Sequence, residues 1–92
     1  MRYFVELSNE AKVDIKDALD YYSDLSNSLK DRFQNELTQS IEILFKNPLH
    51  YQIRYKNIRI IFTNVFPYAI HYIVENEYVY ILKVLHTKRF YK

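Results

Sequence analysis

The spacing of apolar residues changes once along this 92-residue chain, and that change restricts the folds open to it. Up to residue 47, apolar side chains recur every three or four residues, which is the period of an amphipathic helix. From Ile58 onward, short runs of β-branched and aromatic residues alternate with polar turns, which is typical of strands. A chain of this length supports one domain, 1–92, so we expect a single α+β domain.

Two helices are expected in the first half of the chain. Ser8 is placed to cap the first helix, and the polar stretch 26–28 is placed to cap the second. The pair Asn47-Pro48 should end the second helix, with Asn47 in the left-handed conformation. The short link between the helices predicts an antiparallel hairpin. The polar side of the first helix carries a row of aspartates that we interpret as solvated: Asp14, Asp17, Asp20 and Asp24.

Four strands are expected around these helices. Alternation over Tyr3 to Leu7 predicts an opening strand, and three further strands are predicted over Ile58–Thr63, Tyr68–Val74 and Val79–Leu85. The predicted order is β-α-α-β-β-β, with the helical hairpin packed on one face of a small, mostly antiparallel four-stranded sheet. Because the chain has no glycine, Asn or Asp must occupy turn positions that need a positive φ.

Both faces of the predicted sheet are apolar. In the strand Tyr68–Val74, for example, Ile70 and Tyr72 lie opposite Ala69 and Ile73. Two helices can cover only one face, so we expect the other to be an exposed apolar patch that binds a partner or a second copy. The alternative is that aromatic rims and Lys or Arg stems of the chain itself cover this face.

Charge is distributed unevenly between the two halves of the sequence. Residues 1–47 carry six Lys/Arg and nine Asp/Glu, whereas residues 48–92 carry seven Lys/Arg and two glutamates. A basic C-terminal half suggests an anionic partner, either nucleic acid or an acidic protein segment.

Cysteine is absent, which excludes disulfides, thiolate catalysis and cysteine-based zinc sites. The absence of cysteine fits a reducing cytoplasm. No stretch has the pattern of a signal peptide or of a membrane span, so we expect a soluble, cytoplasmic protein with no membrane partner.

An ordered set of short motifs resembles the ParE-like (plasmid stabilisation) branch of the RelE/ParE superfamily of toxins. The motifs are Leu7-Ser8-Asn9-Glu10-Ala11, Asp20-Tyr21-Tyr22, Asn47-Pro48, Tyr55-Lys56-Asn57-Ile58-Arg59, Phe66-Pro67-Tyr68 and Val84-Leu85-His86-Thr87-Lys88-Arg89. The resemblance implies a type II toxin that a cognate antitoxin neutralises in a hetero-oligomer. It also implies one of two targets, because ParE-like members poison DNA gyrase and RelE-like members cut messenger RNA in the ribosome.

Cleavage of RNA through its 2′-hydroxyl needs a base, an acid and cations around the phosphate. If this chain is a nuclease, Arg59, His86 and Arg89 are the candidate catalytic residues. RelE-like nucleases usually carry an arginine where this chain has Ala69. We therefore favour a ParE-like inhibitor of gyrase. The alternatives are a RelE-like ribosome-dependent endoribonuclease and a non-toxic or degenerate interaction module.

Basic residues of the C-terminal half are the candidates for binding the target or the antitoxin. They are Arg54, Lys56, Arg59, His71, Lys88 and Arg89, with Tyr51 and Tyr55 interleaved. Aromatic rings among cations can stack on bases while the cations hold phosphates, or the cations can grip acidic antitoxin side chains. The alternative is a solvated edge.

The three histidines give a further expectation. A two-residue turn at 76–77 would place His71 opposite Leu82 and bring His86 to the same face of the sheet, unless a bulge reverses the alternation. The spacing of His50, His71 and His86 is not that of a metal site, so neither a metal nor a cofactor is expected.

Overall fold

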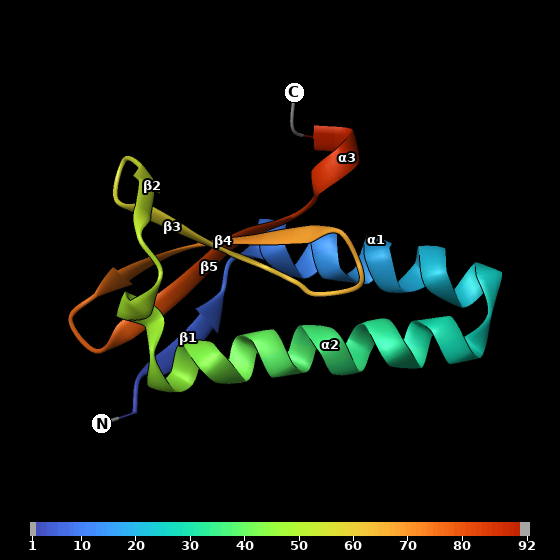
Figure 1. Ribbon diagram of the computed structural model, residues 1–92, viewed down its shortest axis with the longest axis horizontal. Coiled ribbons are helices and arrows are strands. Elements are labelled where there is room, and N and C mark those ends of the chain that lie inside the picture. The colour runs from blue at the N-terminus through green and yellow to red at the C-terminus, as the bar shows by residue number, and fades with distance from the viewer. Residues whose placement is uncertain (1, 91–92) are drawn as a thin grey trace.

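A computed structural model describes residues 2–90 of the chain, except for the side chains of residues 89 and 90 (Figure 1). The elements follow one another as β1 (Phe4–Leu7), α1 (Asn9–Leu25), α2 (Asn27–Lys46), a 3₁₀ turn η1 (Pro48–His50), β2 (Ile53–Tyr55), β3 (Ile58–Phe62), β4 (Tyr68–Glu75), β5 (Tyr78–His86) and a short α3 (Thr87–Phe90). Two helices packed on a mostly antiparallel sheet confirm the predicted α+β class.

Serine hydroxyls start both long helices. The Oγ of Ser8 accepts a hydrogen bond from the backbone of Ala11 at 3.0 Å, and the Oγ of Ser26 accepts one from Leu29 at 3.0 Å. Each cap satisfies an amide that has no partner inside the helix, so the two predicted helix starts are confirmed. The prediction of a left-handed Asn47 is wrong, because its φ is −133° and the chain enters the turn η1 instead.

The sheet has five strands in the order β1-β5-β4-β3-β2, one more than predicted. Among the strands that the structure describes, β1 and β5 pair in parallel and all other pairs are antiparallel. Sequence patterns missed β2 because it has three residues, all exposed, and pairs with β3 through an irregular register. The turn between β2 and β3 needs positive φ at Lys56 (45°) and Asn57 (67°), so a lysine takes one position that we expected Asn or Asp to fill.

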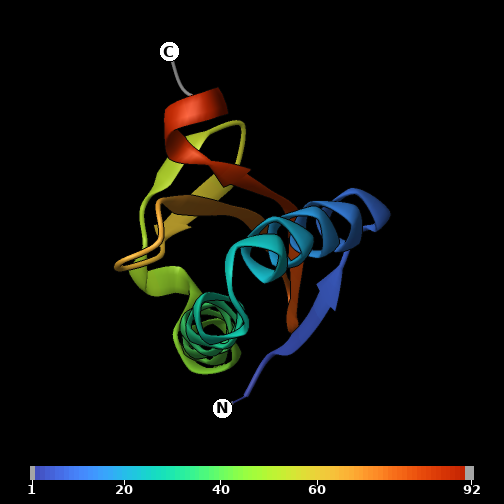
Figure 2. The same cartoon turned by 90° about the vertical axis from the view of Figure 1, so that its right-hand side faces the viewer.

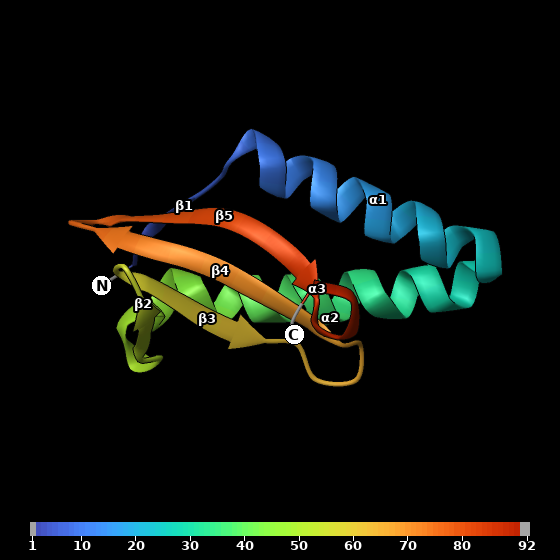
Figure 3. The same cartoon turned by 90° about the horizontal axis from the view of Figure 1, so that it is seen from above.

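The helices α1 and α2 run side by side along one face of the sheet (Figures 2 and 3). Their apolar sides and the sheet enclose an aromatic cluster in which the rings of Phe33 and Tyr68 lie 4.9 Å apart and those of Tyr22 and Phe66 lie 5.0 Å apart. Ile70, Tyr72, Val79 and Ile81 extend this core along the sheet.

One aspartate of α1 contradicts the prediction of a fully solvated polar side. The Oδ2 of Asp14 accepts a hydrogen bond from the backbone of Val84 at 2.9 Å. This contact ties α1 to β5 close to the bulge in that strand. Because β1 ends opposite Ile81, the outer side of β5 has no strand partner at Val84, and a carboxylate can accept from its amide there.

The face of the sheet that points away from the two long helices is called the open face below. Ile60, Ala69 and His71 lie on it, and they are only 7%, 0% and 4% exposed. The expected continuous apolar patch is therefore absent from its centre, where Tyr55 of β2 reaches across to His71. In Figures 1 and 2, β2 and α3 stand on this side of the sheet. Phe4, Phe62 and Tyr78 stay exposed toward its ends, and the ring of Tyr55 stays partly exposed over its centre.

Candidate functional site

A bulge between β4 and β5 decides which way the histidines face. His71 pairs with Lys83, and Tyr72 pairs with Ile81, so Leu82 is the extra residue of β5. Beyond the bulge, His86 pairs with Tyr68, whose ring belongs to the core under the helices. The expectation that the two histidines share a face is therefore wrong, because the extra residue reverses the alternation.

His71 is held by a side chain from another strand. The hydroxyl of Tyr55 lies 3.1 Å from the Nδ1 of His71. Burial lowers the pKa of His71 below its ordinary value of 6.5, and the nearby charge of Lys83 lowers it further. His71 is therefore neutral at pH 7, and its contact with Tyr55 fixes β2 over the centre of the open face.

Two cations and an exposed aromatic ring surround this pair of residues. The guanidinium carbon of Arg54 lies 5.8 Å from the ring centroid of Phe62, which is 49% exposed. Lys83 lies across from His71 on β5. We call this region the cationic end of the open face; it comprises Arg54 and Phe62 together with Tyr55, His71 and Lys83, which border it at the centre of the face. Its guanidinium, ammonium and aromatic groups suit a partner that presents carboxylates or phosphates.

The remaining candidate residues lie elsewhere. Arg59 pairs with Tyr72 in the register and donates a hydrogen bond to the backbone oxygen of Tyr51, which gives it a structural contact. Lys56 lies exposed in the turn before β3. Lys88 is exposed in α3, and its backbone N–H donates to the Nδ1 of His86 at 3.2 Å. The side chain of Arg89 lies outside the described residues.

The register separates the candidate nuclease residues. Arg59 on β3 lies beside Tyr72, and His86 on β5 lies beside Tyr68 on the same central strand. Tyr72 and Tyr68 are four residues apart along β4, and β3 and β5 are two strand spacings apart. The backbones of Arg59 and His86 are therefore roughly 16 Å apart. Two groups at that separation do not share one scissile phosphate without a large movement, so the structure does not bring Arg59 and His86 into one catalytic centre.

Burial also makes one tyrosine unusual on the helix side of the sheet. Tyr72 is fully buried, and its hydroxyl donates to the backbone oxygen of Pro48 at 2.6 Å. Burial raises the pKa of Tyr72 to about 12, although the positive charge of Arg59 opposes this effect. The phenol therefore stays protonated at neutral pH and fastens η1 to β4.

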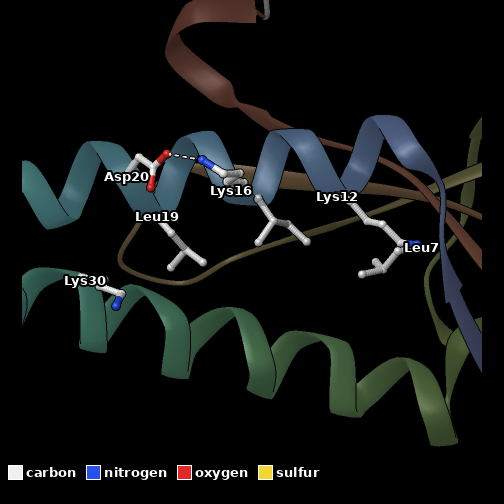
Figure 4. A pocket seen from close by; sticks show the side chains of 7 residues that line it. Leu7, Lys12, Lys16, Leu19, Asp20 and Lys30 are labelled. Atoms are coloured by element: carbon white, nitrogen blue, oxygen red, sulfur yellow. Dashed lines mark hydrogen bonds and ion pairs between the residues drawn. The ribbon is translucent and has the colours of Figure 1, made fainter.

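A groove between the two long helices is the feature that sequence analysis missed. It has a volume of about 410 Å³ and an apolar floor formed by Leu7, Ile15 and Leu19. Figure 4 shows Lys12, Lys16 and Asp20 of α1 and Lys30 of α2 around it. We call this the helix groove. Lys12 and Lys16, four residues apart beside Ile15 and Leu19, were the available signal, but Lys30 of α2 reaches the groove only because the two helices pack together.

One of the groove lysines already has an acidic partner. The Nζ of Lys16 lies 2.8 Å from the Oδ2 of Asp20, and this contact raises the pKa of Lys16. Lys12 and Lys30 form no ion pair within the described part of the chain. The helix groove thus combines apolar contact area with positive charge that is available to a partner.

Residues 2–90 contain neither a membrane-spanning helix nor a metal site. No helix in that range is long and apolar enough to cross a membrane. No three His, Asp or Glu side chains there are grouped so that they could hold a metal ion.

Comparison with known proteins gives a family and a fold. The profile of the family described as "ParE toxin of type II toxin-antitoxin system, parDE" matches residues 5–91. A solved structure of the chromosomal ParDE toxin–antitoxin system from P. aeruginosa superposes with a TM-score of 0.79 and 13% identity, over 92% of this chain and 96% of the other. The E. coli DinJ-YafQ toxin–antitoxin complex gives a TM-score of 0.65 and 16% identity, with full coverage of both chains. No curated protein sequence matches.

Proposed function

Because this chain belongs to the ParE toxin family of type II toxin–antitoxin systems, we propose that it stops bacterial growth by binding DNA gyrase in the cytoplasm. The match of the family profile to residues 5–91 is the observation that carries this proposal. The cationic end of the open face is the surface that we assign to the target.

The chemistry of the cationic end supports a binding role. Arg54 suits both kinds of anionic partner, because a guanidinium can donate two parallel hydrogen bonds to a carboxylate or to a phosphate. The exposed ring of Phe62 beneath it supplies apolar contact area, and Lys83 adds a second positive charge. Aromatic and arginine side chains together commonly dominate the binding energy of protein interfaces.

Two features argue against cleavage of RNA. The position that carries an arginine in RelE-like nucleases is Ala69, which is fully buried here. The register also keeps Arg59 and His86 four residues apart along the central strand, on the two strands that flank it. A binding inhibitor needs neither a base nor an acid at a phosphate, so these features are compatible with gyrase as the target.

The helix groove is the surface that we assign to a cognate antitoxin. An amphipathic helix fits a groove with an apolar floor, and acidic side chains on that helix would meet Lys12 and Lys30 at the rim. Both superposed structures are described as toxin–antitoxin assemblies. We therefore infer a hetero-oligomer in which the antitoxin occupies the helix groove.

Expression of the toxin without an antitoxin tests the proposed target. We expect plasmid DNA to lose negative supercoiling while early transcripts stay intact. The double variant Arg54→Glu and Lys83→Glu should restore supercoiling, whereas Lys46→Glu, an exposed lysine at the end of α2, should not. Rapid cleavage of messenger RNA at fixed codon positions, with normal supercoiling, would show that the chain is a nuclease instead.

A further inference from the structure

The first strand of the sheet has a free outer edge. β1 pairs only with β5, and the backbone N–H of Phe4 donates to the oxygen of Glu77 at 2.8 Å. In a parallel ladder, alternate residues direct both of their backbone groups toward the same neighbour. The backbone groups of Val5 and Leu7 therefore point away from β5, toward the side where no strand of the described chain lies.

Beside this edge, the open face carries aromatic rings and carboxylates in two cross-strand rows. The register places Phe4, Tyr78 and Glu75 in one row, and Glu6 and Tyr80 in the next. The rings of Phe4 and Tyr78 lie 5.3 Å apart, and those of Tyr78 and Tyr80 are stacked at 5.8 Å. We call these five residues the acidic end of the open face.

The acidic end is exposed and hollow. Phe4 is 57% exposed and Tyr78 is 38% exposed, which is unusual for such large rings. A depression of about 350 Å³ lies between Glu6 and Glu75, with Tyr80 among its lining residues. Neither glutamate forms an ion pair with a cation of the chain from residue 2 to residue 88.

Two carboxylates at this end act on the hydroxyl of Tyr80. Burial raises the pKa of the Tyr80 hydroxyl, and the charges of Glu6 and Glu75 raise it further. An arginine or lysine placed there would contact aromatic faces and carboxylates at once, two interactions that favour a cation. The cationic end, at the other side of the open face, contains no Asp or Glu among its defining residues.

We propose that the free edge of β1 and the acidic end together bind an extended, arginine- or lysine-bearing segment of a partner protein. The segment adds to the sheet as a further strand on β1, and its main chain hydrogen-bonds to Val5 and Leu7. Every second side chain of the segment then points to the open face, about 4.8 Å from the β1 residues Phe4 and Glu6. A cationic side chain at that position reaches over Phe4 or Tyr80 to the carboxylate of Glu6.

This mode of binding assigns separate tasks to the two features. The strand edge recognises an extended backbone of any sequence, and the acidic end selects positive charge at alternate positions. Neither surface overlaps the cationic end or depends on gyrase being the target. Failure of this proposal would therefore leave the proposed function untouched.

A binding titration with synthetic peptides tests the proposal on the purified full chain. The probe is a short fluorescein-labelled peptide that alternates arginine and valine, and its control has glutamate in place of arginine. We expect only the arginine peptide to bind. Affinity should fall about threefold with Glu6→Gln and about tenfold with Glu6→Gln and Glu75→Gln combined. Asp24→Asn, a matched change at an exposed carboxylate of α1, should leave affinity unchanged.

Amide hydrogen exchange on the same sample tests the strand edge without any substitution. The amides of Val5 and Leu7 should exchange more slowly once the arginine peptide is added, and those of α1 should not change. Equal binding of both peptides, equal effects of Asp24→Asn and Glu6→Gln, or unchanged exchange at Val5 and Leu7 would each overturn the proposal.

Discussion

One carboxylate of α2 holds the loop between β3 and β4, and its removal gives the sharpest stability prediction. The Oε1 of Glu36 accepts a hydrogen bond from the backbone of Val65 at 3.0 Å, and its Oε2 accepts one from Phe66 at 2.9 Å. Phe66 is 7% exposed and packs in the aromatic cluster, so these bonds also position a core ring. Glu36 is half-buried, which limits screening by water.

The expected cost follows from those two bonds. A hydrogen bond to a charged acceptor contributes about 1.5 kcal/mol at a partly exposed site. Glu36→Ala should therefore lower the free energy of unfolding by about 2–3 kcal/mol, and the Tm by roughly 10–20 °C for a domain of this size. Glu36→Gln keeps one acceptor oxygen and should lose about half as much.

Urea denaturation followed by circular dichroism measures these losses. The matched control is Gln39→Ala, an exposed position on the same helix that lies beside the same loop. We expect the control to change stability by less than about 0.5 kcal/mol. Equal stability of Glu36→Ala and Gln39→Ala would show that the hydrogen bonds from Val65 and Phe66 to Glu36 do not stabilise the fold.

Three further predictions concern buried polar groups. Burial raises the pKa of Tyr72 in the folded state to about 12, whereas the phenol of the unfolded chain ionises near pH 10. The natural chain should therefore lose about 2–3 kcal/mol of stability between about pH 10 and pH 12. Tyr72→Phe should not show this loss, and urea titrations of both chains across that range measure it. Protonation of His71 should destabilise the fold as pH falls below 6.5, because the pKa of His71 is lowered in the folded state. Lys83→Met removes a nearby positive charge and should move the pKa of His71, measured by NMR, back toward 6.5. Tyr68→Phe should leave stability unchanged or raise it by up to about 1 kcal/mol in thermal unfolding, because the buried hydroxyl of Tyr68 has no hydrogen-bond partner among the described residues. A loss of stability in this variant would reveal such a partner.

The parts of the fold that depend on local pattern could be predicted from the sequence. Ser8 and Ser26 are recognisable as caps because a serine before an apolar helical stripe satisfies a free amide. The strands from β3 to β5 were evident from their runs of β-branched and aromatic residues. The antiparallel hairpin of helices followed from a link too short for any other arrangement.

The parts that depend on register or on distant contacts could not be predicted. The extra residue Leu82 turns the end of β5 over, and no composition signal marks a bulge. The burial of Ala69 and His71 depends on β2, a strand of three exposed residues that leaves no periodic trace. The helix groove needs Lys30 of α2 near Leu19 and Asp20 of α1, a proximity that only the packed helices create (Figure 4).

In the candidate site too, charge could be predicted from the sequence, but the contacts between residues of different strands could not. Arg54 was selected from the sequence for its charge, but Phe62 and Lys83 enter the cationic end only through the folded sheet. Arg59 was selected for the same reason, yet it donates a hydrogen bond to the backbone of Tyr51. A basic residue in a strand can serve a partner or its own fold, and periodicity does not distinguish the two.

A titration of purified DNA gyrase with the purified chain, read as supercoiling activity, tests whether the chain inhibits gyrase through the cationic end. Inhibition should reach completion at a stoichiometric excess of the natural chain. The variant Arg54→Glu with Lys83→Glu should inhibit at least about tenfold less strongly, and Lys46→Glu should inhibit equally well. Gyrase that stays fully active, or that the double variant inhibits as well as the natural chain does, would contradict the account of the cationic end as the target-binding surface.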